Sequence, residues 1–207
     1  MKIKNINIDE LFSTIDLCLK KSFPTDFDAR CLYTACSIYT ILKDAGVKSV
    51  IVGGDVGAFT LSNDGRQASL EGFGGSSQDQ PSHYWVEANG ILLDPNISYL
   101  PKRSRIQRAP MPMIAWRCAY ALPKGLQYKG IIRYDEDAEF LFPDEISKRI
   151  STFIEQCRKI YKSTAAKKKL STWILSSPES LINKARSGDK WSIGVSRFQL
   201  MSSTPTI

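Results

Sequence analysis

The sequence contains a single histidine, and it lacks any long apolar run. No stretch approaches the roughly 18 apolar residues that a membrane-spanning helix requires. The first residues, 1–11, carry two lysines with no apolar segment behind them, so they do not resemble a signal peptide. The 207 residues are enough for one sizeable hydrophobic core with an appendage.

The cysteines are too few and too scattered for a disulfide scaffold. There are five of them, an odd number, and no two form a Cys-x-x-Cys pair. This pattern excludes a zinc knuckle and is typical of a reducing compartment. We therefore predict a cytoplasmic protein without metal or cofactor, and leave secretion as an effector open.

Basic charge is concentrated in the second half of the chain. Residues 1–100 hold 8 Lys and Arg against 12 Asp and Glu, whereas residues 101–207 hold 20 against 9. The excess is either a solvated surface or a binding site for an anionic partner such as nucleic acid or an acidic protein. The clustered residues that could bind such a partner are Lys102, Arg103, Arg105, Arg108 and Lys167–Lys169.

The first half alternates helical and strand patterns. The apolar period predicts a helix over Ile8–Lys21 and a second one from an N-cap at Asp28 to Ala45, where Gly46 ends it. The second helix is apolar all round, so we expect it to be central and buried. Five strands are predicted next: Val47–Val52 ending at Gly53-Gly54, Val56–Leu61, Gln67–Phe73, His83–Ala88 and Ile91–Asp94. A polar loop at Gly74–Pro81 precedes the fourth, and the turn Asn89-Gly90 joins the last two.

The second half is predicted to be more helical. The patterns indicate strands at Ile114–Ala121 and Gln127–Tyr134 and an amphipathic helix over Pro143–Tyr161. A capping box at Ser176–Glu179 predicts the start of a short last helix, which ends before Gly188. The end, Ser202–Ile207, is expected to fray. We divide the chain into a core, residues 1–135, and a basic helical extension, residues 136–207, packed on or appended to the core.

The predicted turn at Asn89-Gly90 brings two polar residues together. A two-residue turn there places Asp94 opposite Trp85, and His83 and Trp85 share a face because side chains alternate along a strand. Asp94 is then the diagonal neighbour of His83, close enough for its carboxylate to accept a hydrogen bond from the ring. A base and an orienting acid stand in this relation in a catalytic triad.

Cys31 is the candidate nucleophile for such a base. It lies in the first turn of the predicted central helix, where the helix dipole and unpaired amide groups stabilise a thiolate. Its own amide N–H could serve in an oxyanion hole. Cys36 lies deeper along the same helix and is interpreted as structural.

Four segments together resemble the core of the transglutaminase-like proteins, over about residues 25–97: Cys31–Ala35, Gly46–Gly53, His83–Glu87 and Asp94-Pro95. The resemblance implies an α+β, papain-like fold, in which a central buried helix carrying the cysteine packs on an antiparallel β-sheet, here with additional C-terminal helices. It also implies a Cys31, His83, Asp94 triad that attacks the carbonyl carbon of an amide or thioester. A peptidase is the most common outcome, and deamidase, transglutaminase and acyltransferase are related ones.

Each of these residues also has a simpler interpretation. Cysteines in helices are usually small core residues, and an Asp before a proline commonly forms a turn. His83, beside Tyr84 and Trp85, could be a surface or core residue. The alternative to an enzyme is therefore a catalytically silent module, or an effector or toxin, whose basic C-terminal half binds nucleic acid or an acidic protein. The second oxyanion donor, the substrate and the oligomeric state are left open.

Overall fold

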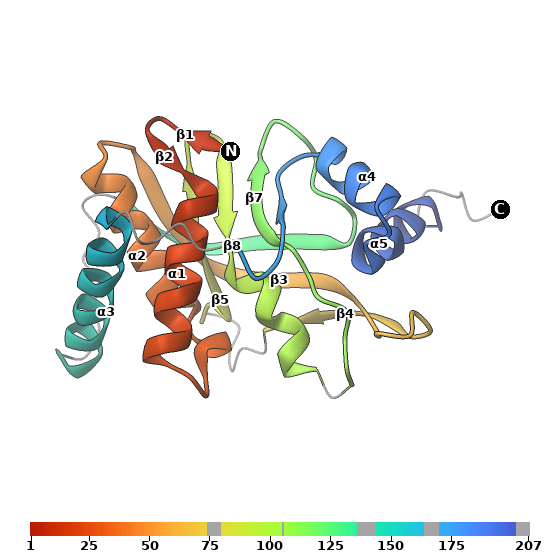
Figure 1. The fold of residues 1–207 in the computed structure, drawn as a ribbon, viewed down its shortest axis with the longest axis horizontal. Coiled ribbons are helices and arrows are strands. Elements are labelled where there is room, and N and C mark those ends of the chain that lie inside the picture. The colour runs from red at the N-terminus through yellow and green to blue at the C-terminus, as the bar shows by residue number, and fades with distance from the viewer. Residues whose placement is uncertain (74–79, 105, 136–143, 164–169, 202–207) are drawn as a thin grey trace.

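The protein has a mixed α+β architecture built on one curled sheet (Figure 1). The computed structural model describes residues 1–73, 80–104, 106–135, 144–163 and 170–201. Its helices are α1 (Ile8–Ser22), α2 (Cys31–Asp44), α3 (Asp144–Lys162), α4 (Pro178–Arg186) and α5 (Lys190–Met201), with 3₁₀ segments η1 (Phe27–Ala29) and η2 (Asn96–Arg103).

The strands form a small ribbon and a larger sheet. The ribbon pairs β1 (Lys2–Ile3) with β2 (Ile6–Asn7). The larger sheet contains β3 (Ser49–Leu61), β4 (Ala68–Gly72), β5 (His83–Ala88), β6 (Ile91–Asp94), β7 (Met113–Arg117), β8 (Leu126–Tyr134) and β9 (Ile174–Leu175).

The long strand β3 organises this sheet. One of its edges pairs with β8, and its other edge pairs first with β5 and then with β4. The order continues from β5 through β6 and β7 to β9, and every pairing is antiparallel except β7 with β9. Because β5 lies between β3 and β6, its side chains are positioned from both sides.

The sheet separates two hydrophobic cores. Helices α1, α2 and α3 cover one face and bury Ile51 and Val86. Their immediate neighbours in the strands, Val52 and Trp85, point into the second core with Trp191 of α5. Figure 1 shows α1–α3 together on one side and α4 and α5 at the other end. Each fully buried large side chain contributes about 1.5–3 kcal/mol to stability, so both cores hold the sheet in place.

The two helices predicted in the first half are present, with one error. Helix α1 matches its prediction, but α2 begins at Cys31 and not after an N-cap at Asp28. Asp28 lies instead in η1, because Phe27 is buried with its ring 5.0 Å from that of Tyr99 and this contact turns the chain just before the helix. The residue that precedes α2, Arg30, makes no side-chain cap.

Gly53 and Gly54 were predicted to end a strand, but they lie inside β3. The register between β3 and β8 shifts at this pair, which is the mark of a bulge. A Cβ on Gly54 would lie 2.1 Å from the carbonyl oxygen of Lys129 and 2.8 Å from the Trp85 ring. The glycine is therefore required by the close approach of β8 and Trp85, and the two predicted strands form one.

The predicted hairpins are confirmed. Leu61 pairs with Ala68 across the first turn, and Ala88 pairs with Ile91 across the second. The strand predicted at Ile114–Ala121 is shorter, since β7 ends where the Trp116 indole N–H donates to the carbonyl of Tyr120 at 3.0 Å and closes a turn. Strand β8 matches its prediction. The predictions for residues 74–79 and 202–207 fall outside the described residues.

The C-terminal third packs on the rest of the protein. Helix α3 packs on α1 and α2, β9 extends the sheet, and α5 packs on β3. The predicted capping box lies one residue later, with Ser177 and Ser180, and α4 is not the last helix, because α5 follows. The division at residue 135 stays a prediction. No helix in the described part of the chain combines the length and apolarity that crossing a membrane requires.

We predict that Gly54→Ala lowers the free energy of unfolding by at least about 2 kcal/mol, because the new methyl group would overlap the backbone of β8. The matched control is Gly57→Ala in the same strand, where the nearest atom to a new Cβ is a side-chain oxygen of Gln127 at 3.4 Å. Denaturant unfolding of the two variants measures the difference. Equal effects would contradict the proposed role of Gly54.

Candidate active site

Cys31 is the first residue of α2. Its side chain is half-buried. It lies at the first turn of the helix, where the backbone N–H groups have no carbonyl acceptor within the helix. The positive end of the helix dipole favours a negative charge at this position. The predicted placement of a thiol at the N-terminus of the buried helix is therefore confirmed.

His83 is the first residue of β5 and is completely buried. It pairs across the sheet with Gly54. The Phe73 ring stacks on the imidazole with 4.3 Å between centroids and an interplanar angle of 5°, and the Trp85 ring centroid lies 6.4 Å away. These rings exclude water from the imidazole faces.

The structure brings His83 and Asp94 into direct contact. The Nε2 atom of His83 lies 2.8 Å from Oδ2 of Asp94, and both side chains are buried. The turn responsible has positive φ angles at both central residues, +48° at Asn89 and +71° at Gly90, as a type I′ turn requires. The proximity predicted from this turn is confirmed.

Asp94 accepts two further hydrogen bonds. The Tyr128 hydroxyl donates to Oδ2 at 2.9 Å, and the Ile97 amide donates to Oδ1 at 3.2 Å. Together with the histidine, three donors stabilise the carboxylate. The side chain is thereby fixed in place and can hold one orientation of the imidazole.

The electrostatic state of His83 follows from these contacts. Burial alone would lower its pKa, but the charge and hydrogen bond of Asp94, together with the Cys31 side chain, raise the pKa to about 10. Nε2 bonds Asp94, and the other ring nitrogen, Nδ1, is buried with no hydrogen-bond partner within the described residues. This environment favours the imidazolium form of His83.

Cys36 lies in a different environment although it shares the helix. Burial, and then the charge of Cys31, raises the pKa of the Cys36 thiol to about 12. Cys36 therefore remains a neutral thiol at neutral pH, and its reactivity is low. The two cysteines of α2 are a natural pair for comparison.

Tyr128 is a site residue that the sequence analysis missed. Burial, and then the Asp94 carboxylate, raise its pKa well above the usual value, so it stays a hydroxyl donor. The Trp85 ring contacts it edge-on, with centroids 5.1 Å apart. Tyr128 was within a predicted strand, but only the long-range pairing of β8 with β3, Val56 opposite Tyr128, brings it to Asp94.

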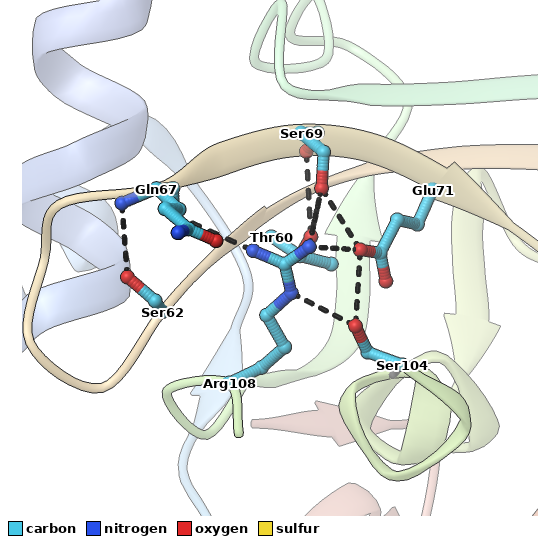
Figure 2. Close-up of polar contacts among 7 residues, drawn as sticks. All are labelled: Thr60, Ser62, Gln67, Ser69, Glu71, Ser104 and Arg108. Carbon is cyan, nitrogen blue, oxygen red and sulfur yellow. Dashed lines mark hydrogen bonds and ion pairs between the residues drawn. The ribbon is translucent and has the colours of Figure 1, made fainter. Parts of the chain in front are cut away.

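Two residues of the predicted basic cluster, Arg108 and Lys102, make contacts within the protein. Arg108 forms an ion pair with Glu71 and donates to the Ser69 and Ser104 hydroxyls, and its side chain is only 8% exposed (Figure 2). The Lys102 ammonium lies 4.0 Å from the centre of the Phe27 ring. Arg105 and residues 167–169 lie outside the described residues. Binding of an anionic partner stays a prediction.

Within the described ranges, no three His, Cys, Asp or Glu side chains are grouped so that they could hold a metal ion.

Comparisons with known proteins do not assign this site. No family model and no curated protein matches the chain. One solved structure, the crystal structure of a structural-genomics target, aligns over 83% of this chain and 87% of its own, with 17% sequence identity and a TM-score of 0.46. Similarity at this level identifies neither a family nor an activity, so the function must be argued from the residues.

We predict that the stability contributed by His83 falls as the pH rises. The folded pKa of about 10 exceeds the ordinary value of 6.5, so the contribution is complete below about pH 6.5 and is lost as the pH approaches 10. Urea unfolding of the wild type and of His83→Gln across this window measures it. The difference in free energy of unfolding between the two proteins should shrink with pH, and a constant difference would contradict the assigned protonation.

Proposed function

We propose that this chain is a cysteine enzyme of transglutaminase-like type, with a papain-like α+β fold, that acts on an amide or thioester bond. The observation that supports it most is the buried His83 and Asp94 pair, together with the cysteine at the start of α2, which is close enough to contribute to the raised pKa of the imidazole. A nucleophile, a base and an orienting acid in this relation form a triad. The resemblance of residues 25–97 to the transglutaminase-like core gives the same three residues.

The reaction would proceed through a thioester with the enzyme. The Cys31 thiolate attacks the substrate carbonyl carbon, forming a carbon–sulfur bond and an oxyanion, which the Cys31 amide N–H would stabilise. His83 then donates its proton to the leaving group as the bond to it breaks. Asp94 holds the ring and stabilises its positive charge throughout.

The second half-reaction sets the reaction class. Neutral His83 removes a proton from water or from an amine as that group attacks the thioester carbon, and the thiolate leaves. Water gives hydrolysis of a peptide bond or deamidation of an amide side chain, and an amine gives transfer. We place peptidase first, with deamidase, transglutaminase and acyltransferase as the related outcomes.

We expect iodoacetamide at neutral pH to label Cys31 selectively. Cys31→Ala should abolish the fast labelling, while Cys36→Ala should retain it, because the raised pKa of Cys36 keeps that sulfur protonated. Mass spectrometry of the modified peptides distinguishes the two sites. It is best done in a Cys118→Ser background, since Cys118 is exposed.

The partners of Cys31 are tested in the same assay. Asp94→Asn should slow the alkylation of Cys31 and, once a substrate is known, lower kcat by roughly 10²- to 10⁴-fold. Equal labelling of Cys31 and Cys36 in the wild type would overturn the assignment. That result would favour the alternative, a catalytically silent module that binds an anionic partner.

A further inference from the structure

A groove of about 500 Å³ lies beside the candidate active site, between β4 and η2. Gly72 lines it, and the next residue, Phe73, stacks on His83. Leu100 and Ile106 give the groove apolar walls, and two arginines, Arg103 and Arg108, give it a basic character. The groove is therefore one side chain away from the imidazole.

Arg103 is close to both parts of the site. Its guanidinium carbon lies 5.9 Å from the centre of the Phe73 ring, and that ring lies 4.3 Å from the imidazole, so at most about 10 Å separates the cation from the His83 ring. On its other side, Nε of Arg103 lies 3.8 Å from Oδ2 of Asp28, three residues before Cys31. Arg103 therefore contacts both the ring that stacks on His83 and the segment that leads into Cys31.

The two arginines of the groove differ in the charge they can offer. The guanidinium of Arg108 is compensated by Glu71 and occupied by the hydroxyls of Ser69 and Ser104 (Figure 2). Arg103, in contrast, has a side chain that is 44% exposed, and within the described part of the chain its guanidinium makes no hydrogen bond. It forms an ion pair with Asp28, but the 3.8 Å between Nε and Oδ2 is too long for a hydrogen bond, so the paired N–H donors stay available.

We propose that Arg103 is a specificity-determining residue that binds a carboxylate of the substrate. The planar guanidinium presents paired N–H donors that match a carboxylate, and the apolar walls accommodate a short aliphatic stem. The preferred substrate then carries an acidic residue next to the amide or thioester that Cys31 attacks. This inference rests on the proposed function.

The test compares two alkylating reagents that differ only in charge, the α-amides of N-bromoacetyl-glutamate and N-bromoacetyl-glutamine. In both, the Cys31 thiolate forms a carbon–sulfur bond and bromide leaves. We expect the wild type to react roughly 2- to 5-fold faster with the glutamate reagent, which corresponds to an exposed ion pair of about 0.4–1 kcal/mol. Mass spectrometry of the Cys31 peptide gives both rates.

Variants show whether Arg103 itself causes the preference. Arg103→Gln should bring the ratio of the two rates to about one, and Arg103→Lys should leave an intermediate ratio, because it keeps the charge but not the paired donors. The matched control is Arg149→Gln, which removes the same charge from an exposed side chain of α3 and should keep the wild-type ratio.

The outcomes separate this inference from the proposed function. If the neutral reagent labels Cys31 selectively, but the wild type shows no preference or Arg103→Gln keeps it, the role of Arg103 is overturned while the enzyme assignment stands. An equal loss in Arg149→Gln would also overturn it, because net charge would then be the cause. If neither reagent modifies Cys31 faster than it modifies free cysteine, the proposed function fails, and this inference fails with it.

Discussion

The buried ion pair between His83 and Asp94 is the interaction on which the rest of the site depends. Removing two charged groups from water costs several kcal/mol for each, and their attraction offsets this only with good geometry and further hydrogen bonds. The 2.8 Å contact, the Tyr128 hydroxyl and the Ile97 amide supply both. Removing either side chain of the pair would leave the charge of the other buried and uncompensated.

The sheet is built so that these groups meet. His83 starts β5, Asp94 ends β6 and Tyr128 lies on β8, which reaches the pair only because it runs along the opposite edge of β3. Gly54 lies directly opposite His83 and allows both Trp85 and the β8 backbone to approach. A bulky residue at this position would separate the strands that hold His83, Asp94 and Tyr128 together.

Local signals in the sequence were enough for half of the site. The Asn89-Gly90 turn fixes the register of β5 and β6, and with it the contact between His83 and Asp94. The helix with Cys31 was predicted from its apolar residues, but its start was misplaced, because the burial of Phe27 against Tyr99 is a tertiary contact that no local pattern contains.

The elements that were missed depend on contacts distant in the sequence. Tyr128 meets Asp94 through a pairing between strands about 70 residues apart, where loop closure rather than local preference decides. Strand β9 has two residues and exists only because β7 offers a free edge. Helix α5 is held by Trp191, whose buried indole N–H donates to the Phe59 carbonyl at 2.8 Å. The glycines of β3 were misinterpreted because a strand end and a bulge both favour glycine.

The most direct test is the titration of His83 by NMR, since the chain has one histidine and its ring signals are unambiguous. We predict that in the folded protein the ring stays protonated through neutral pH with a pKa of about 10, because Asp94 and Cys31 raise this pKa by more than burial lowers it. Cys31→Ala should lower that pKa. A ring that titrates near the ordinary 6.5, or one that does not respond to Cys31→Ala, would contradict the proposed triad.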